Sequence, residues 1–461
     1  MNVGWRKNLQ GKIVRTGLVA RTGRVARTGL VASLLTGMTL GLAACSTTNE
    51  LIDKVTGSSD KVVITGKREA VLQRSGDGLT LAKEPVVIPV AKTNSSWAQP
   101  GGVPSNALHN LSLGRSLKRV FAINAGTGST SAGRLTAMPI VVAGKVYVLD
   151  SEASVRAFSA SSGAPVWAVS LVPKGKDGEG AFGGGLASDG RQVFVTTAFG
   201  EVVALSAGTG AQIWRKQFSS PIKTAPTVAN GQVYFVTVAN EVYSLSVSNG
   251  AELWRSQGSG ETASAISNTS PAIAGGIVVS PHTNGDVVAF SAGGGQRYWS
   301  ESLASSRAGA SVANLNAIAG RPVIAGGQVF AISNAGRMAA FNLKSGAEIW
   351  SREFSGNQTP WVSGDYVFII SQKYRLAAIS RKNGAVKWVV DLPGRGLWAG
   401  PVMGGGRLLA VSSKGVLASI SPQTGKLMKT SEAGDAFYIA PVIAGNTVYL
   451  LDNNASLVAL R

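Results

Sequence analysis

Short apolar runs separated by glycine-containing breaks recur along most of the chain. The stretch Pro322–Trp350 is typical, since PVIAGGQVFAISNAGRMAAFNLKSGAEIW holds four apolar runs separated by Gly-Gly, Asn-Ala-Gly and Lys-Ser-Gly. Runs rich in Val, Ile and Phe and bounded by Gly, Asn and Ser predict antiparallel strands joined by tight turns. The stretch therefore predicts one four-stranded sheet that ends in a tryptophan. Because both faces of such a sheet are apolar, neighbouring copies must cover it.

The spacing of this unit is constant through the chain. Its third run ends on an apolar residue eight times, at Phe158, Leu205, Leu245, Phe290, Phe341, Ile379, Ile420 and Leu460. Nine residues later come Trp167, Trp214, Trp254, Trp299, Trp350 and Trp388, and then Lys429 in the seventh unit. Nineteen residues earlier lies a proline, except at Leu186 in the second unit. Eight units with two fixed offsets predict an all-β fold, an eight-bladed β-propeller of four-stranded blades in which these tryptophans pack between blades.

The eighth unit needs a strand from elsewhere, because Leu460 is followed only by Arg461. Without its outer strand this blade would leave an open edge and an unclosed ring. The run from Leu117 to Asn124 suits this place, and Phe121 lies eighteen residues before Pro139, where a tryptophan would fall. We therefore predict that an N-terminal strand closes the ring and that the propeller spans residues 111–461. The 58 glycines and the low charged fraction, 15%, suit such a turn-rich fold with a large core.

Residues 1–44 have the features of a secretory signal that belongs to a lipoprotein. Seven basic residues and no acidic residue lie between Arg6 and Arg27, and the apolar run Leu30–Leu42 is too short to span a bilayer. Leu42-Ala43-Ala44-Cys45 is similar to the lipobox of bacterial lipoproteins, and Cys45 is the only cysteine. This resemblance implies lipidation of Cys45 and attachment to the outer membrane, since Ser46 rather than Asp follows. An ordinary signal peptide with an incidental cysteine is the alternative.

Residues 45–110 are expected to form a lipidated tether and an extended lead-in. Prolines at positions 85, 89, 100 and 104 disfavour a central strand and favour an extended path over the propeller surface. Trp97 is expected to pin this path by burial of its indole. A mobile tether with an exposed Trp97 is the alternative.

The chain is strongly basic, with a formal net charge of +20. Seven of the positive residues lie in the signal, so its removal leaves about +13 (20 − 7), most of it on the propeller. A basic surface suits an anionic lipid or an acidic protein, or is simply a soluble surface. Nucleic acid is not expected as a partner, because no Lys/Arg cluster interleaved with aromatic residues occurs.

Residues for catalysis or metal binding are scarce. His109 and His282 are the two histidines, neither has neighbours at ligand spacing, and both are expected to be solvated loop residues. Aspartates at positions 150, 189, 286, 365 and 452 are isolated and are expected to accept turn N–H groups. We therefore predict no catalytic residue, no metal site, no cofactor and no small-molecule substrate.

The repeat resembles the tryptophan-docking repeat of pyrroloquinoline-quinone propellers. Leu205–Trp214 and Phe341–Trp350 show it best. Two classes share this repeat: quinoprotein dehydrogenases, and the BamB family of lipoproteins in the β-barrel assembly (BAM) complex. The dehydrogenases carry a disulfide between adjacent cysteines and an acidic calcium cluster. The chain has a single cysteine and no such cluster at repeat-equivalent positions.

The lipobox, the eight units and the segment Asn94–Gly102 are similar to BamB proteins of the alphaproteobacterial type. This resemblance implies a non-enzymatic scaffold, anchored by lipid at the periplasmic face of the outer membrane. It implies docking on the POTRA domains of BamA, contact with other BAM subunits, and assistance in the insertion of outer-membrane proteins. The alternatives are a periplasmic propeller lipoprotein that binds another envelope partner, such as peptidoglycan, and a quinone-dependent dehydrogenase.

The connections between units indicate where a partner would bind. All length variation falls between the tryptophan of one unit and the proline of the next, and the longest connections are Ala168–Gly185, Arg255–Ser270 and Ser300–Arg321. Insertions on one face of a repeat array commonly form a binding surface. In the BamB family the loops that resemble the last two dock on POTRA domains, but the family's Leu-x-Leu-Arg run and aspartate pair are absent here. The expected replacements are Ile266, Asn268, Arg307, Leu315, Ile318 and Arg321; the alternative is that these loops are merely long.

Overall fold

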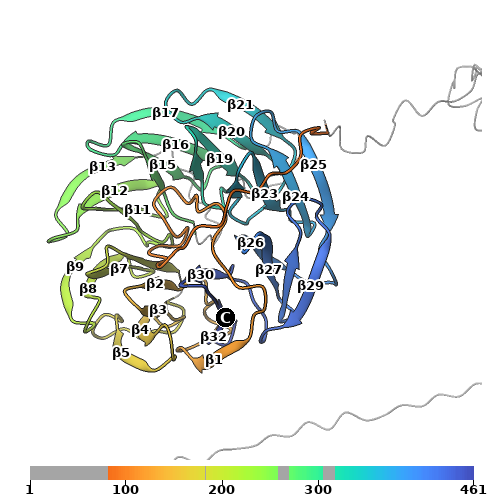
Figure 1. Cartoon of the computed structure of the whole chain (residues 1–461). Helices are drawn as coiled ribbons and strands as arrows, with labels where there is room; N and C mark the ends of the chain where they lie inside the picture. Colours follow the sequence, from red (N-terminus) through yellow and green to blue (C-terminus); the bar gives the residue numbers. More distant parts are fainter. Residues whose placement is uncertain (1–80, 182, 258–268, 305–316) are drawn as a thin grey trace, which may run out of the picture. The chain divides into compact units, whose positions relative to one another are not determined.

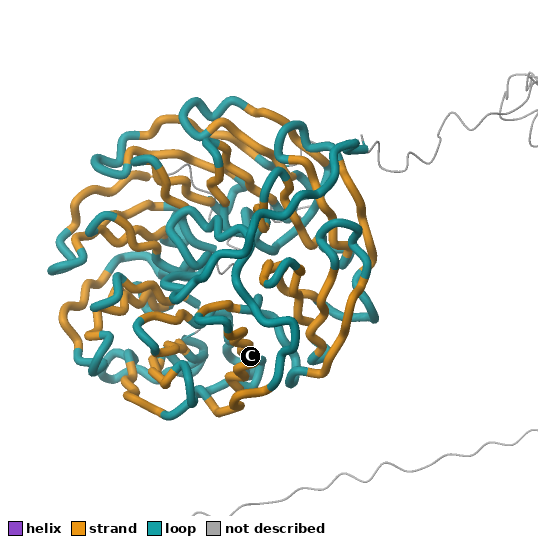
Figure 2. Tube along the Cα trace, viewed as in Figure 1, coloured by secondary structure: helices purple, strands orange, loops and turns teal. Residues whose placement is uncertain are grey.

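The computed structural model describes residues 81–181, 183–257, 269–304 and 317–461. The regular secondary structure in these residues consists of β-strands alone. They form eight four-stranded antiparallel sheets around a central axis (Figures 1 and 2). The prediction of an eight-bladed β-propeller is confirmed. In blades 1 to 7 the strands pair in chain order, from the innermost strand to the outermost.

The strand bounds follow the repeat. Blades 1 and 2 contain β2 (Ile140–Val142), β3 (Lys145–Leu149), β4 (Ser154–Ser159), β5 (Pro165–Ser170), β6 (Gly184–Ser188), β7 (Gln192–Thr197), β8 (Glu201–Ser206) and β9 (Gln212–Gln217). Blades 3 and 4 contain β10 (Thr227–Ala229), β11 (Gln232–Val236), β12 (Glu241–Ser246), β13 (Glu252–Gln257), β14 (Ala272–Ala274), β15 (Ile277–Pro281), β16 (Asp286–Ser291) and β17 (Arg297–Ser302).

The second half of the ring repeats this arrangement. Blades 5 and 6 contain β18 (Val323–Ala325), β19 (Gln328–Ile332), β20 (Met338–Asn342), β21 (Glu348–Arg352), β22 (Trp361–Ser363), β23 (Tyr366–Ile370), β24 (Arg375–Ser380) and β25 (Val386–Asp391). Blades 7 and 8 contain β26 (Trp398–Gly404), β27 (Arg407–Ser412), β28 (Val416–Ile420), β29 (Leu427–Glu432), β30 (Val442–Ala444), β31 (Thr447–Leu451), β32 (Ser456–Leu460) and β1 (Arg119–Asn124).

Each tryptophan of an outermost strand docks on a turn of the following blade. Its indole N–H donates to a backbone carbonyl there, in the pairs Trp167–Ala207, Trp214–Val247, Trp254–Ala292, Trp299–Leu343, Trp350–Arg381 and Trp388–Pro422. The ring packs on a glycine of the same turn: a Cβ at Gly250, where φ is +67°, would lie 2.7 Å from Cε3 of Trp214. Glycine adopts this backbone conformation freely and leaves room for the indole. The constant spacing of Gly and Trp is therefore the spacing of a contact between blades.

Strand β1 closes the ring as the sequence predicts. It pairs with β32, and Phe121 lies opposite Ala459 as Trp214 lies opposite Ala204 in blade 2. A Cβ on Gly163 of blade 1 would lie 2.9 Å from the Phe121 ring. Because phenylalanine has no N–H, the hydrogen bond across this junction comes from Tyr449, whose hydroxyl donates to the Ala160 carbonyl at 2.8 Å.

Lys429 replaces tryptophan in blade 7 for a topological reason. The third and fourth strands of blade 8, β32 and β1, are distant in the sequence, so no glycine turn joins them and no docking place exists. Backbone hydrogen bonds between Lys118 and Arg461 take the place of this turn. Strand β29 is accordingly exposed along its whole length.

Residues 94–111, which we call the central plug, cross the centre of the ring (Figure 1). The innermost strand of every blade has one edge that no other strand pairs with. The plug hydrogen-bonds to the backbone of seven of these strands and, in blade 6, to the indole of Trp361. In order of the blades, the bonded residues are Trp97–Val141, Ala98–Ser188, Gln99–Val228, Pro104–Ile273, Ser105–Ile324, His109–Trp361, Leu111–Met403 and Asn94–Ile443.

The predicted burial of Trp97 is confirmed, and its ring stacks on Trp361 with centroids 6.3 Å apart. Residues 81–93 follow the expected extended path over the surface of the propeller. The plug, residues 94–111, instead lies inside the ring. Among the described residues, the contacts that close the ring are those of β1 with β32 and of the plug with the innermost strands.

The tryptophan contact between blades predicts that alanine substitution will affect stability differently at Trp350 and at Lys429, which occupy equivalent positions of blades 5 and 7. Trp350→Ala removes a buried indole and its hydrogen bond, and should lower the free energy of unfolding by about 3–5 kcal/mol. Lys429→Ala, at the same position of blade 7, should change it by less than about 0.5 kcal/mol. Denaturant unfolding of both variants measures this. Equal losses would show that docking on the turn contributes nothing.

Candidate docking face

The turns divide the ring into two faces. The plug lies with the turns that join the first strand to the second, since Gly445 N–H donates to Asn94 and Gly405 N–H donates to Leu111. This plug face also carries the turns between third and fourth strands, because antiparallel strands reverse direction at each turn. The links between blades lie on the other side, the connection face. The described ends of the long connections therefore share one face, opposite the plug.

Only part of the predicted contact set falls in the described residues. Ile266, Asn268, Arg307 and Leu315 lie outside them, and their role remains a prediction. Ile318 is 1% exposed and packs with Leu303 and Ile324 in the core between blades 4 and 5.

Arg321 is 7% exposed, and both its backbone N–H and its Nη1 donate to the Thr359 hydroxyl. Burial lowers its pKa to about 10, so it remains a cation at neutral pH. Residues 317–322 lead directly into the innermost strand β18, so neighbouring blades cover their side chains. The expectation that Ile318 and Arg321 face a partner is therefore wrong: they hold the connection in place.

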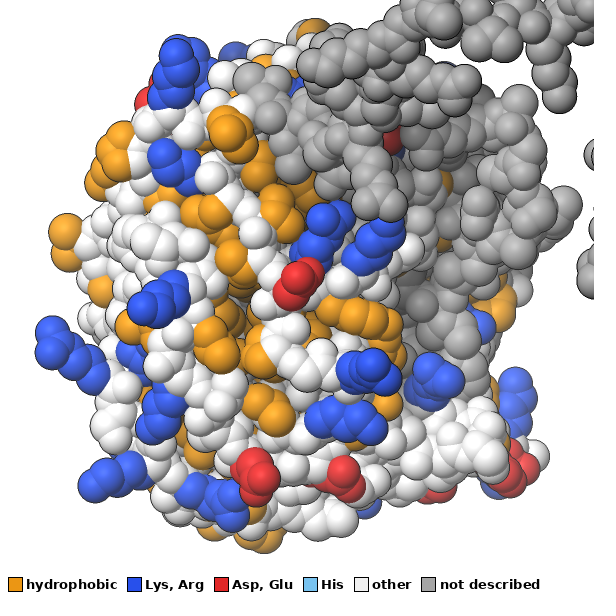
Figure 3. Space-filling model, turned by 90° about the vertical axis from the view of Figure 1, so that its right-hand side faces the viewer, with side chains coloured by type: hydrophobic (Ala, Val, Ile, Leu, Met, Phe, Trp, Pro, Cys, Tyr) orange, Lys and Arg blue, Asp and Glu red, His pale blue; other side chains and the backbone are white. Residues whose placement is uncertain are grey.

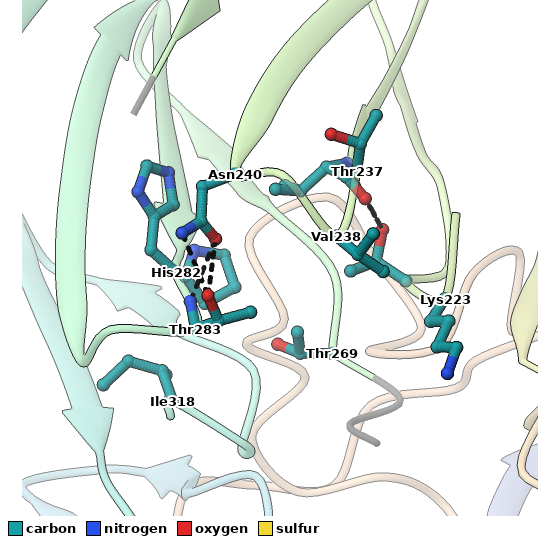
Figure 4. Close-up of a pocket in the computed structure, with 11 residues that line it drawn as sticks. Lys223, Thr237, Val238, Asn240, Thr269, His282, Thr283 and Ile318 are labelled. Carbon is teal, nitrogen blue, oxygen red and sulfur yellow. Dashed lines mark hydrogen bonds between the residues drawn. The ribbon is translucent and has the colours of Figure 1, made fainter. Parts of the chain in front are cut away.

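A small polar cavity lies on the connection face between blades 3 and 4 (Figure 4). Its volume is ≈ 20 Å³, which is room for about one water molecule. Beside it, Asn240 Nδ2 donates to Thr283 Oγ1 at 2.9 Å, and Thr283 N–H donates to Asn240 Oδ1 at 3.0 Å. These two bonds tie the turns of blades 3 and 4 together, so the cavity belongs to a junction of blades.

His282 lines the same cavity and is 1% exposed. Burial lowers its pKa to about 4, and the nearby Asp286 opposes this shift. Neither ring nitrogen has a hydrogen-bond partner among the described residues. The expectation of a solvated loop histidine is therefore wrong for His282. His109 is half-buried in the plug, where burial, then Arg381 and Lys92, lower its pKa.

A wider depression of ≈ 450 Å³ borders the first long connection, between blades 1 and 2. Lys176 lies over the ring of Phe199, with Nζ 5.6 Å from the ring centroid. Nearby, Glu201 is buried and lies 3.5 Å from Nη1 of Arg215. Burial raises the pKa of Glu201, while Arg215 and Lys176 lower it. The depression thus brings an aromatic ring and several charged side chains together on the connection face.

The described residues contain no group of three or more His, Cys, Asp or Glu placed to hold a metal ion. Three of the expected turn aspartates, Asp150, Asp189 and Asp452, do accept backbone N–H groups of their own turns. Within the described parts of the chain there is also no apolar helix of membrane-spanning length.

The sequence profile of the family described as outer membrane protein assembly factor BamB matches residues 151–390 and 387–461. The chain belongs to this family. The match begins at the turn after β3 and covers the repeats through β32. Comparison with curated protein sequences gives no match.

Solved structures share the fold. BamB from Moraxella catarrhalis is 18% identical with a TM-score of 0.64, covering 75% of this chain and 99% of that one. A quinohemoprotein alcohol dehydrogenase from Comamonas testosteroni is 13% identical with a TM-score of 0.66, covering 80% and 81%. A europium-containing methanol dehydrogenase is 13% identical with a TM-score of 0.63, covering 77% and 89%. At these identities the likeness concerns the propeller fold alone, since one fold supports many functions.

Sequence reasoning missed the polar contacts of the connection face. Asn240 and Thr283 stand in ordinary turns, and Phe199 and Lys176 meet only through the packing of blades 1 and 2. None of these residues recurs with the repeat, so no spacing signals them.

The buried His282 predicts a pH dependence of stability. Its folded pKa, about 4, lies below the unfolded value of 6.5, so its contribution is complete above pH 6.5 and is lost as the pH falls toward 4. Between pH 7 and pH 4.5 the wild type should lose about 2–3 kcal/mol more than His282→Gln. Denaturant unfolding across this range measures it. Parallel pH profiles would contradict the buried neutral histidine.

Proposed function

We propose that this chain is a non-enzymatic scaffold lipoprotein of the outer-membrane β-barrel assembly complex. In this role it docks on the POTRA domains of BamA, contacts other BAM subunits, and assists insertion of outer-membrane proteins. The observation that carries the proposal is family membership together with a ring whose long connections share one free face. Its own plug fills the centre of the other face, so the connection face is the place for a partner.

We assign docking to the connections that flank blade 4, which include Ile266, Asn268, Arg307 and Leu315. Aliphatic anchors beside Arg suit a modest contact in which few side chains carry most of the binding energy. The buried Ile318 and Arg321 fix the end of the second of these connections at β18. The depression beside Lys176 and Phe199 enlarges this face toward blade 2.

Arg307→Glu combined with Leu315→Glu tests the docking assignment. The double variant should lower recovery of a POTRA-bearing barrel protein from solubilised membranes by about tenfold or more, because an aliphatic anchor and a cation of the same connection are both lost. Arg191→Glu with Ile213→Glu is the matched control, since Arg191 lies in a turn of the plug face and Ile213 on the rim. Recovery should stay at the wild-type level for the control.

Two outcomes would contradict the proposal. Recovery of cell-wall components without any barrel protein would favour the alternative of another envelope partner. Dye reduction after reconstitution with pyrroloquinoline quinone would favour the dehydrogenase, whose fold this chain shares. Unchanged recovery of the double variant would move the docking face elsewhere.

We also propose lipidation of Cys45, which would place the chain at the periplasmic face of the outer membrane. Two or more acyl chains anchor a protein stably, whereas one anchors it marginally. Cys45→Ser should move the protein from the membrane to the soluble fraction of cells, while Thr48→Ser should leave it in place. The purified Cys45→Ser protein should still bind isolated POTRA domains. Membrane retention of Cys45→Ser would contradict the anchor.

A further inference from the structure

Exposed cations gather on one sector of the plug face, which we call the basic sector. It comprises residues 81–92 of the lead-in, Arg115 after the plug, and the turns between third and fourth strands of blades 5, 6 and 7. Its exposed cations are Lys83, Lys92, Arg115, Lys344, Lys382 and Lys426. Figure 3 shows the side of the ring that faces right in Figure 1, where Lys and Arg side chains are spread widely with few Asp or Glu.

Carboxylates compensate little of this charge. The exposed acids of the sector are Glu84, Asp365 and Glu348, and Glu348 is already paired with Arg337. Three further cations lie beneath the exposed ones and donate to backbone carbonyls: Arg381 to Gly364 and Ala325, Lys387 to Ala82 and Lys83, and Arg407 to Gly114. A backbone carbonyl accepts the hydrogen bond of such a cation but does not neutralise its positive charge. The net charge of the sector is therefore strongly positive.

The connection face of the same blades is balanced. Its exposed cations Lys373, Arg395 and Lys414 are accompanied by the exposed acids Glu353, Asp391, Glu432 and Asp435. The positive field is thus a property of one face rather than of blades 6 and 7 as a whole.

Apolar side chains project from the lead-in among these cations. Leu81, Val87 and Val90 are 71%, 65% and 89% exposed. The lead-in cannot turn them inward, because Ala82 N–H donates to Val386 and the Tyr366 hydroxyl donates to Glu84. Lys92 at the far end is held by backbone bonds to Asn110 and Ser112. The ring thus holds large apolar side chains in water next to a positive surface.

We propose that the basic sector is the face that this protein lays on an anionic phospholipid membrane. Lysine and arginine side chains are attracted to acidic headgroups, and Leu81, Val87 and Val90 enter the boundary between headgroups and acyl chains. A nucleic acid would use the cations but leave the fixed aliphatic side chains in water, whereas a membrane takes up both kinds of group. Lipid therefore accounts for both features.

The route of the chain agrees with this orientation. The described chain begins at Leu81, which lies beside Val386 at the start of β25 and within the basic sector. Cys45 lies 36 residues earlier (81 − 45). With this sector on the membrane, the connection face points away from it and stays free for a partner. The proposal adds to the proposed function the orientation of the ring on the membrane. It depends neither on docking to POTRA domains nor on lipidation of Cys45.

Vesicle binding of the chain from residue 46 to 461 tests the proposal. This chain keeps the complete ring and lacks both the signal and Cys45. It should sediment with phosphatidylglycerol–phosphatidylcholine vesicles and not with phosphatidylcholine alone, and added salt should release it. The variant Lys83→Glu/Lys382→Glu/Lys426→Glu should need at least about tenfold more lipid for half-binding.

The matched control reverses three charges on the connection face, Lys373→Glu/Arg395→Glu/Lys414→Glu, and should change half-binding less than about threefold. The double variant Val87→Ser/Val90→Ser should bind the vesicles more weakly. A larger share of its remaining binding should be lost on addition of salt, because the apolar contribution has been removed. Thermal unfolding verifies that every variant keeps the ring. Equal losses in the two triple variants, or equal binding to neutral vesicles, would overturn the proposal. Because no POTRA domain is present, failure here is separate from failure of the docking proposal.

Discussion

The contact of an indole with a glycine turn of the next blade governs this structure. Each blade is a sheet with two apolar faces, and it becomes stable only when its neighbours cover them. Trp214 on the turn at Gly250 shows how the register between blades is fixed: the indole N–H has one carbonyl within reach, and the ring fills the space that a Cβ would occupy. This contact occurs six times around the ring. At the junction of blades 8 and 1, Phe121 and Tyr449 take its place, and the ring closes there.

Closure also requires the unpaired edges at the centre of the ring to be satisfied. The plug does this for seven of the innermost strands, with its backbone at five and with the Gln99 and Asn94 side chains at two, and in blade 6 its His109 carbonyl accepts from the Trp361 indole. A segment that precedes the repeats therefore holds them together at the axis, while β1 holds them together at the rim. As a result, the two faces of the ring differ: one is filled at its centre by the chain itself, and the other carries long connections of unequal length.

This asymmetry organises the proposed function. A protein anchored at a membrane and bound to a partner needs two separate surfaces, and here they would lie on opposite ends of one rigid ring. The basic sector and the exposed Leu81, Val87 and Val90 of the lead-in lie on the plug face. The polar junction of Asn240 with Thr283 and the depression beside Phe199 lie on the connection face. Similarity to quinoprotein dehydrogenases, at 13% identity, concerns the propeller fold alone.

The sequence by itself determined the eight blades, the docking tryptophans and the strand that closes the ring. It could do so because these contacts recur at fixed offsets: Phe121 was recognisable because it stands where a tryptophan belongs, and Lys429 because it breaks the series. Tertiary structure alone decided the path of the plug, the burial of His282, Ile318 and Arg321, and the gathering of Lys83, Lys382 and Lys426 on one sector. These arrangements join residues that are far apart in the sequence and follow no repeat. Whether such side chains are covered or exposed depends on which blade lies beside them, and that is settled only when the ring closes.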